Sequence, residues 1–445
     1  MIHPLLRHAP DSPARRLAGW ARLTVAVTGL LAYASCTNRA PISTGVTPCV
    51  GDRCGNPVRI NNNLDILFMI DASSSMAAMQ QKLLAQLPTF MQTLQALPTG
   101  LPSIHVAVVS SDMGAPSDQG TAIGCDSIGQ AGVFQIAPRG TCTTNSFNDP
   151  TAMFISDNAS GTEKNFTLPD PMGISTELQC IGLLGSGGCG FEHQLAAIDR
   201  ALGADSTPDT PDPPEQNRGF LRDGAYLAII MLTNEDDCSA PAGTSLYSLN
   251  GGNQDLSNPL GPIANYRCNQ FGHLCEDPSG PNPTMLQAPP LNPPPDATGP
   301  ATAPALSLTD CQSNDTESGM LTPVSKFISD IKALKKDPDN QILVAAIVGP
   351  TTPYTAEWLP AAGPNRELWP QIEHSCTSGN GDGSFADPPV RIAQFVAAFG
   401  NNGFTASICD DDYASSMKAI AARLGKLINP MCVSSAGVPN VPGCP

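Results

Sequence analysis

The chain reads Leu64-Asp65-Ile66-Leu67-Phe68-Met69-Ile70-Asp71-Ala72-Ser73-Ser74-Ser75-Met76, an almost continuous apolar run that ends in an aspartate and three serines. An apolar run of this length is typical of a strand buried on both faces of a parallel sheet. From Met79 to Leu97, leucines and methionines then recur at spacings of three, four and seven, which predicts a helix with one apolar face. Pro88 interrupts this pattern, and we expect a kink or a restart there, because proline lacks the N–H donor.

The alternation of strand and helix patterns continues along the chain. Further strands are expected at 104–109, 226–232, 342–348 and 404–408, and further helices at 195–202, 324–334, 391–399 and 413–428. This order predicts an α/β fold with a doubly wound, mainly parallel sheet flanked by helices. In such a fold, ligands bind beyond the carboxyl ends of the strands.

The expected domain spans residues 64–430 and is followed by a tail at 431–445. Long stretches without periodicity predict insertions at about 114–188, 238–318 and 350–390. Nine prolines lie between Pro281 and Pro304, a density that favours extended polyproline-like chain over a packed domain in the second insertion.

The first 35 residues resemble an export signal. Four arginines stand there against one acid, Asp11, and are followed by the apolar run Leu23 to Ala34. This run is too short to cross a bilayer core of about 30 Å as a helix. Ala34-Ser35-Cys36 resembles the lipobox of bacterial lipoproteins, which implies lipid attachment at Cys36 and a tether over residues 36–63. Tyr33 replaces the usual leucine, and cleavage after Ala32-Tyr33-Ala34 is the alternative.

The cysteine content indicates an oxidising compartment outside the cytoplasm, and the net charge excludes one class of partner. Removal of the signal takes away four cationic and one anionic side chain and lowers the formal charge from −17 to −20. Such a surface repels polyanions, so no nucleic-acid partner is expected. Without Cys36, the 15 cysteines leave 14, enough for seven disulfides. Close spacings suggest local staples, although they do not fix the connectivity: Cys49/Cys54, Cys125/Cys142, Cys180/Cys189 and Cys432/Cys444. Zinc at Cys49 and Cys54 is a weaker alternative to a disulfide.

The candidate metal-binding motif of the sequence consists of Asp71, Ser73 and Ser75. A carboxylate and two hydroxyls at alternate positions of a strand-to-helix turn can point at one cation, and hard oxygen ligands suit Mg²⁺ first, with Ca²⁺ or Mn²⁺ as alternatives. The pattern resembles the metal-ion-dependent adhesion site (MIDAS) of von Willebrand factor type A (VWFA) domains. The alternative is a purely structural role, in which Asp71 caps the following helix.

The resemblance implies two further ligands, a threonine in a later loop and an aspartate after the fourth strand. The sequence has Asn234 where the aspartate is usual, with Asp236 close by, and Glu192 near the threonine position. Asn234 can still ligate through its amide oxygen. The alternatives are a solvated loop for the acidic run at 235–237 and a helix N-terminal acid for Glu192.

The resemblance as a whole implies a VWFA domain-containing bacterial lipoprotein. It would be a non-catalytic envelope module, at the periplasm or cell surface, that captures a protein ligand by sharing the cation with an acidic side chain of that partner. A structural scaffold with a degenerate metal site is the main alternative, and an exported hydrolase is a weaker one. Ser415-Ser416-Met417-Lys418 matches one element of the penicillin-interacting serine enzymes, but no Lys-Thr-Gly element accompanies it. The histidines outside the signal are scattered: His105, His193, His273 and His374.

Overall fold

The computed structural model describes residues 61–428 except 118–119, 123, 159, 169–172, 206–212, 250–257, 262–264, 280–284, 293–303 and 361–367. The predicted signal at 1–35, Cys36, most of the tether and the tail at 431–445 lie outside the described residues. The expected staples Cys49/Cys54 and Cys432/Cys444 also lie outside them.

A six-stranded sheet forms the centre of the domain, in the order β15-β10-β6-β1-β2-β5. The strands are β1 (Asn63–Ile70), β2 (Ser103–Ser110), β5 (Ile155–Asp157), β6 (Tyr226–Leu232), β10 (Ile342–Val348) and β15 (Gly403–Ser407). Five of them run parallel, and β5 pairs antiparallel with β2. The predicted mainly parallel sheet is therefore confirmed, and β1 lies between β2 and β6, with Asp71 directly after its carboxyl end.

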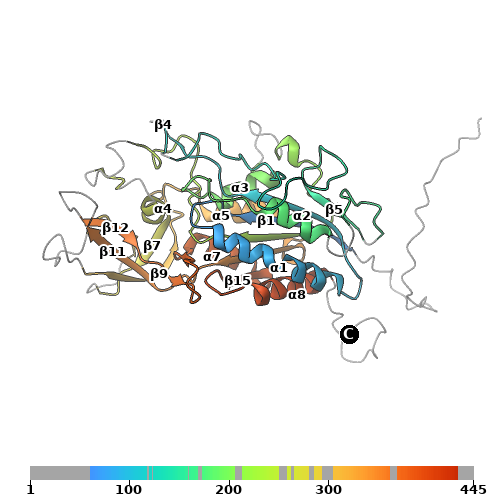
Figure 1. The fold of residues 1–445 in the computed structure, drawn as a ribbon. Helices are drawn as coiled ribbons and strands as arrows, with labels where there is room; N and C mark the ends of the chain where they lie inside the picture. The colour runs from blue at the N-terminus through green and yellow to red at the C-terminus, as the bar shows by residue number, and fades with distance from the viewer. Residues whose placement is uncertain are drawn as a thin grey trace, which may run out of the picture. The chain divides into compact units, whose positions relative to one another are not determined.

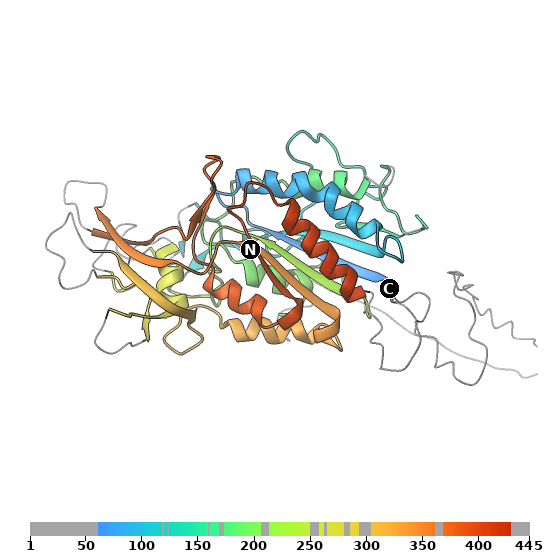
Figure 2. The same ribbon diagram turned by 90° about the horizontal axis from the view of Figure 1, so that it is seen from below.

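Helices cover both faces of this sheet (Figures 1 and 2). Alternate residues of β1 belong to separate cores, Ile66 and Phe68 to one and Leu67 and Met69 to the other. The first core includes α1 (Ala77–Gln95), α2 (Gly173–Gly182) and α8 (Ala414–Ile428); the second includes α3 (Gln194–Leu202), α5 (Val324–Ala333) and α7 (Val390–Ala397). The near-continuous apolar strand sequence is thus explained by burial on both faces.

The expected restart of the first helix at Pro88 does not occur. The helix α1 continues through this proline. Leu87 on one side of the proline and Phe90, Met91 and Leu94 on the other are all buried in the same core. Burial of one apolar face on both sides of the proline offsets the cost of the missing hydrogen bond.

The second and third insertions combine into a second sheet, in the order β12-β11-β9-β7-β8, with antiparallel pairing. Its elements are α4 (Asn265–Gly272), β7 (His273–Glu276), β8 (Met285–Gln287), β9 (Leu306–Ser313), β11 (Tyr354–Pro360) and β12 (Leu368–Ile372). Leu308, Tyr354 and Trp358 lie in its own apolar core. For the described part of 238–318, the expectation of extended chain was therefore wrong. Most of the prolines stand between β8 and β9, and the strands beside them keep enough apolar residues to pack.

Smaller elements complete the fold. They are the strands β3 (Pro116–Ser117), β4 (Gly120–Thr121), β13 (Cys376–Thr377) and β14 (Phe385–Ala386), the helix α6 (Pro338–Gln341), and 3₁₀ turns at Glu215–Asn217 and Gly400–Asn402. Among the described residues, no helix has the length and apolar character needed to cross a membrane.

The ten cysteines of the described chain form five disulfides: Cys125–Cys189, Cys142–Cys180, Cys238–Cys268, Cys275–Cys311 and Cys376–Cys409. The suggested local staples Cys125/Cys142 and Cys180/Cys189 were wrong. Each of these cysteines pairs with a partner from another segment, and Cys180 lies in α2, so the disulfides join segments that are distant in sequence. Five disulfides fit the oxidising compartment that the cysteine content indicates.

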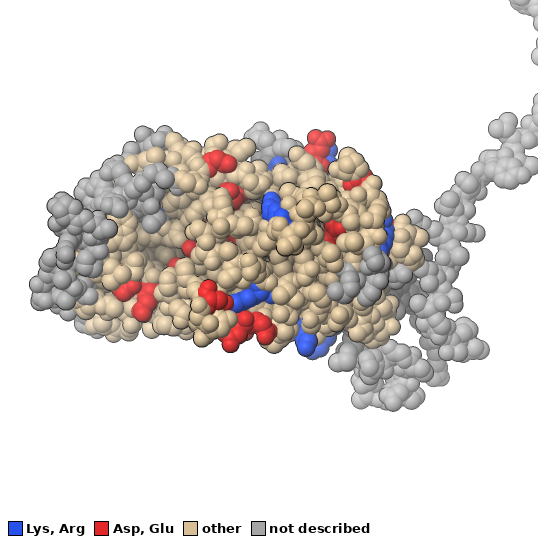
Figure 3. Space-filling view, in the orientation of Figure 1, with Lys and Arg blue, Asp and Glu red and all other residues tan. Residues whose placement is uncertain are grey.

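The surface charge of the domain is dispersed on the face in view. Figure 3 shows acidic and basic side chains there singly or in small groups, with uncharged surface between them.

Candidate metal and ligand site

Asp71 is held rigidly at the carboxyl end of β1. Its backbone N–H donates to the carbonyl of Leu232 at 2.9 Å, which ties the turn to the neighbouring strand β6. The side chain is completely buried. Its Oδ1 accepts from the N–H of Ser73 at 2.7 Å and from the hydroxyl of Ser111 at 3.3 Å, while Oδ2 accepts from the hydroxyl of Thr233 at 2.7 Å. Burial raises the pKa of Asp71, and these hydrogen bonds oppose that rise.

Ser73, Ser75 and Asn234 converge beside this aspartate. The two serine hydroxyl oxygens lie 3.3 Å apart, and the hydroxyl of Ser75 donates to Oδ1 of Asn234 at 3.0 Å. Ser73 and Asn234 are buried and Ser75 is half-buried. The turns after β1 and β6 meet because parallel neighbouring strands end at the same edge of the sheet. Hydroxyl, amide and carboxylate oxygens are therefore concentrated at one point of this edge.

Two residues that support Asp71 were missed from the sequence. Thr233 follows β6 and Ser111 follows β2, so they come from the two strands that flank β1. Gln80 of α1 also reaches back, and its amide donates to the carbonyl of Asp71 at 2.7 Å. The signal for Thr233 and Ser111 was a hydroxyl residue directly after a buried strand, which becomes informative only when the strand order is known.

Asp71, Ser73, Ser75 and Asn234 together are the first site. Glu192 lines a small cavity next to it. The residue is 2% exposed, and its Oε1 has no hydrogen-bond partner. It lines this cavity together with Glu235 and Asp387. Burial raises the pKa of Glu192, and the negative charges of Glu235 and then Asp71 raise it further. Glu192 therefore belongs to the acids that line this cavity.

Asp236 holds the start of α7 and contacts His273. Its Oδ2 accepts from the N–H of Arg391 at 2.7 Å and contacts Nε2 of His273 at 2.7 Å, and its Oδ1 accepts from the N–H of Ile392 at 3.0 Å. Both oxygens are therefore used to hold the first turn of α7. The prediction that Asp236 joins Ser73, Ser75 and Asn234 as a ligand is therefore not met, because both of its oxygens are taken by α7 and His273.

The solvated-loop alternative for the acidic run was also wrong. Asp236 and Asp237 are buried, and Asp237 forms an ion pair with the fully buried Arg391 at 3.0 Å. A buried guanidinium and its carboxylate are stable only as partners. The acids after β6 thus connect the central sheet to α7.

Residues considered for catalysis are separate from one another. His105 bonds the carbonyl of Phe220, His273 contacts Asp236, and His374 contacts Asp387. Ser415, the serine of the Ser-x-x-Lys pattern, is exposed in the first turn of α8, and the next residue, Ser416, is buried.

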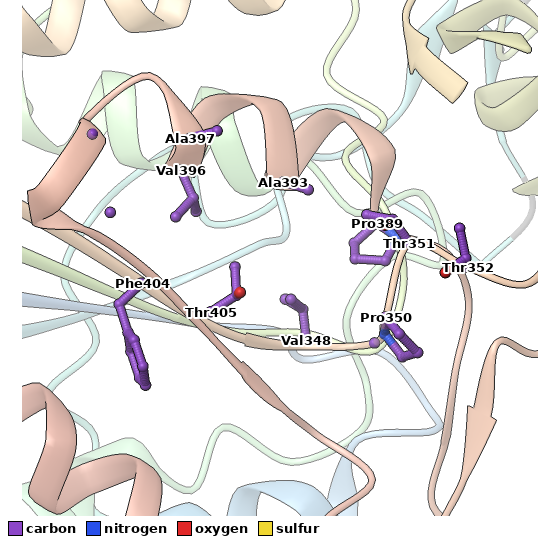
Figure 4. A pocket seen from close by; sticks show the side chains of 13 residues that line it. Val348, Pro350, Thr351, Thr352, Pro389, Ala393, Val396, Ala397, Phe404 and Thr405 are labelled. Carbon is purple, nitrogen blue, oxygen red and sulfur yellow. The ribbon is translucent and has the colours of Figure 1, made fainter. Parts of the chain in front are cut away.

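A pocket of about 420 Å³ lies between α7 and the ends of β10 and β15 (Figure 4). None of the residues that line it is ionisable; among them are Val348, Thr351, Pro389, Val396 and Phe404. This pocket offers shape and apolar contact without an acid, a base or a thiol.

In the part of the chain that the structure describes, no three His, Cys, Asp or Glu side chains group closely enough to hold a metal by themselves. A cation at the first site would depend on the hydroxyls of Ser73 and Ser75 and the amide of Asn234. These are the neutral oxygen donors that Mg²⁺ and Ca²⁺ accept beside a carboxylate, so the donor set fits.

No family model matches the sequence, and no curated protein matches it. Among solved structures, the von Willebrand factor (vWF) domain of the type V pilus tip protein Mfa5 from Porphyromonas gingivalis is 13% identical, with a TM-score of 0.31, over 83% of this chain and 96% of that chain. The pilus adhesin SpaC from Lactobacillus rhamnosus GG is 12% identical, with a TM-score of 0.29, over 82% of this chain and 30% of that chain. The pilus adhesin RrgA from Streptococcus pneumoniae is 10% identical, with a TM-score of 0.28, over 82% of this chain and 44% of that chain. This chain therefore spans less than half the length of SpaC and of RrgA.

Proposed function

We propose that this protein is a non-catalytic binding module of the cell envelope, which captures a protein ligand through a divalent cation held at Asp71, Ser73, Ser75 and Asn234. The observation that carries the proposal is the meeting of Ser75 and Asn234, from turns after different strands, directly beside the buried Asp71. Mg²⁺ is the best candidate, because it is bound by few protein oxygens and keeps other positions for water or a ligand.

The chemistry of the site sets the kind of partner. A cation that is not fully surrounded by protein oxygens can accept a carboxylate oxygen of another molecule. Ser75 is half-buried and Ser74 beside it is exposed, so the turn reaches solvent. A protein that offers an acidic side chain is therefore the proposed ligand, with the cation shared between the two proteins.

Attachment of the module to the membrane is part of the proposal. A lipid on Cys36 would anchor the chain peripherally, with residues 36–63 as the tether. Mass spectrometry of the mature N-terminus tests this directly. A diacylglyceryl cysteine at Cys36 supports the anchor, whereas a free N-terminus at Ser35 indicates ordinary cleavage and secretion.

A structural scaffold is the second candidate, and one observation favours it. Both oxygens of Asp71 already accept hydrogen bonds from protein donors, and Asn234 is uncharged. The turn can therefore be stable without a cation, and its role would then be to join β1, β2 and β6.

Calorimetric titration of the metal-free protein with Mg²⁺, Mn²⁺ and Ca²⁺ distinguishes the two functions. Saturable Mg²⁺ binding that is lost in Asp71→Ala supports the cation-dependent module. If none of the binding by the intact protein is lost in Asp71→Ala, the scaffold is the better description. An Asp411→Ala variant is the control, because it removes an exposed carboxylate from another loop.

A further inference from the structure

A small cavity beside the first site is walled almost entirely by side chains that carry oxygen. Its lining residues are Glu192, Glu235, Asp236, Cys238, Asn265, Cys268, Asn269 and Asp387. Its volume of about 10 Å³ is the room that one water molecule or one monatomic ion needs. Among the described residues that line it there is no Lys, Arg or His; His273 and His374 contact Asp236 and Asp387 from outside the lining.

Glu192 is the second observation that points to an occupant. The residue is 2% exposed and lines the cavity, yet its Oε1 has no hydrogen-bond partner. A buried carboxylate oxygen without a donor is costly, and buried charges are normally paired or bound to a metal. A cation in the cavity would supply the missing partner.

Glu235 and two asparagines, Asn265 and Asn269, line the same cavity. Glu192 and Glu235 line the cavity together, and after burial the negative charge of Glu235 is the main cause that raises the pKa of Glu192. The side-chain amide of Asn265 contacts Oε2 of Glu235, and Asn269 lies one helical turn further along α4. Asp236 is not available as a ligand, because its two oxygens hold α7 and His273.

We propose that this cavity is a second cation site, separate from the one at Asp71, in which Glu192 and Glu235 bind Ca²⁺ with the help of Asn265 and Asn269. Ca²⁺ fits better than Mg²⁺, because it accepts a mixed shell of carboxylate and amide oxygens in flexible geometry, whereas Mg²⁺ keeps several waters.

The position of the cavity gives this cation a structural effect. Asn265 and Asn269 belong to α4 in the second insertion, and Glu235 follows Asn234 in the turn after β6. The Cys238–Cys268 disulfide joins the same two segments. The ion would therefore fix the second insertion to the turn that carries Asn234, and so link the insertion to the first site.

Calorimetric titration with Ca²⁺ alone tests the proposal by counting sites. We expect the metal-free protein to bind two Ca²⁺, and both Asp71→Ala and the double variant Glu192→Gln/Glu235→Gln to bind one. Glu317→Gln is the matched control, because this glutamate is exposed, and it should keep both sites. If Asp71→Ala binds no Ca²⁺, the cavity is not a cation site and holds at most a water.

Failure of the first site gives a different result. In that case the intact protein binds one Ca²⁺, Asp71→Ala still binds it, and the double glutamine variant loses it. Thermal unfolding provides a second readout for the double variant. Removal of two buried acids should raise the melting temperature in chelator and abolish the rise that Ca²⁺ causes in the intact protein. A rise that persists in the double variant would overturn the cavity proposal.

Discussion

Ser75 and Asn234 are 159 positions apart in the chain, and the hydroxyl of Ser75 donates to Oδ1 of Asn234 at 3.0 Å. This contact exists because β1 and β6 are parallel neighbours, which places the turns after both strands at one edge of the sheet. The hydroxyl of Thr233, the residue before Asn234, also reaches Oδ2 of Asp71 at 2.7 Å. The turn after β6 therefore completes a site that the turn after β1 begins.

An Asn234→Asp substitution should strengthen divalent cation binding by about tenfold, because an added carboxylate increases the charge of the ligand set. The same variant should be less stable in chelator, since it places a second acid beside the buried Asp71. Calorimetry and thermal unfolding measure the two effects. Asn401→Asp, at an exposed position, is the control. Unchanged affinity in Asn234→Asp would indicate that Asn234 is not a ligand.

Asp236 should matter for stability rather than for the first cation. An Asp236→Ala substitution leaves the buried His273 and two N–H groups of α7 without their acceptor. We expect a loss of about 3 kcal/mol in the free energy of unfolding, measured by chemical denaturation. Mg²⁺ affinity of the folded variant should stay within about twofold, an order-of-magnitude expectation for a residue that is not a ligand. If Asp236→Ala has the unfolding free energy of the intact protein but no longer binds Mg²⁺, Asp236 is a ligand of the cation after all.

Much of the fold could be predicted from the sequence because its central strands are buried on both faces. The apolar runs at 64–70, 226–232 and 342–348 have one explanation, a covered parallel sheet, and β1, β6 and β10 confirm it. The second sheet could not be predicted in this way. Its strand β9 pairs with β7 in one insertion and with β11 in another, and such long-range pairing leaves no periodic signal in the intervening sequence.

The site was predictable only where its residues are close in sequence. Asp71, Ser73 and Ser75 belong to one turn, and the structure places them together. Ser111, which donates to Asp71, follows another strand, β2. Whether Asn234 or Asp236 reaches the cation site depends on α7, because the first turn of this helix takes both oxygens of Asp236. The first two acids after Asn234 look alike in the sequence, and both line the cavity, but only Asp236 also caps α7.

Asp199 should make stability depend on pH. It lies on α3, and its carboxyl group is 3.7 Å from Nζ of Lys326. Burial, followed by the negative charge of Asp330, raises the pKa of Asp199 to about 8, against 3.8 for an ordinary aspartate. The folded state holds this proton more tightly, so the stabilisation is complete below pH 3.8 and is lost as the pH rises through about 8.

The Asp199→Asn variant checks this expectation. It keeps the shape of the side chain but cannot ionise, so the decline in stability between about pH 4 and pH 8 should be smaller than in the intact protein. Denaturant melts at several pH values measure the difference, with the exposed Asp411→Asn as a control. An equally steep decline in Asp199→Asn would show that another group is responsible.

The Cys125–Cys189 disulfide should stabilise the loops beside the first site. It closes a loop of 64 positions and joins the segment after β2 to the one that precedes Glu192. The double variant Cys125→Ser/Cys189→Ser should lose about 4 kcal/mol of stability, since the cost increases with loop length. Chemical denaturation under non-reducing conditions measures the loss. A loss below about 1 kcal/mol would mean that these loops are held by their other contacts.

The neighbouring serines Ser74 and Ser75 offer the most closely matched comparison in the molecule. Ser74 is exposed, whereas Ser75 is half-buried and contacts both Ser73 and Asn234. If the hydroxyl of Ser75 is a cation ligand, Ser75→Ala should weaken Mg²⁺ binding by at least about tenfold, and Ser74→Ala should leave it unchanged. Calorimetric titration of the two variants under identical conditions measures this difference. Equal Mg²⁺ affinities of the two variants would mean that neither the hydroxyl of Ser75 nor its contact with Asn234 contributes to cation binding, because Ser75→Ala removes both. The cation would then have to be held without this hydroxyl, and the resemblance of the turn to an adhesion site would have no chemical consequence at this position.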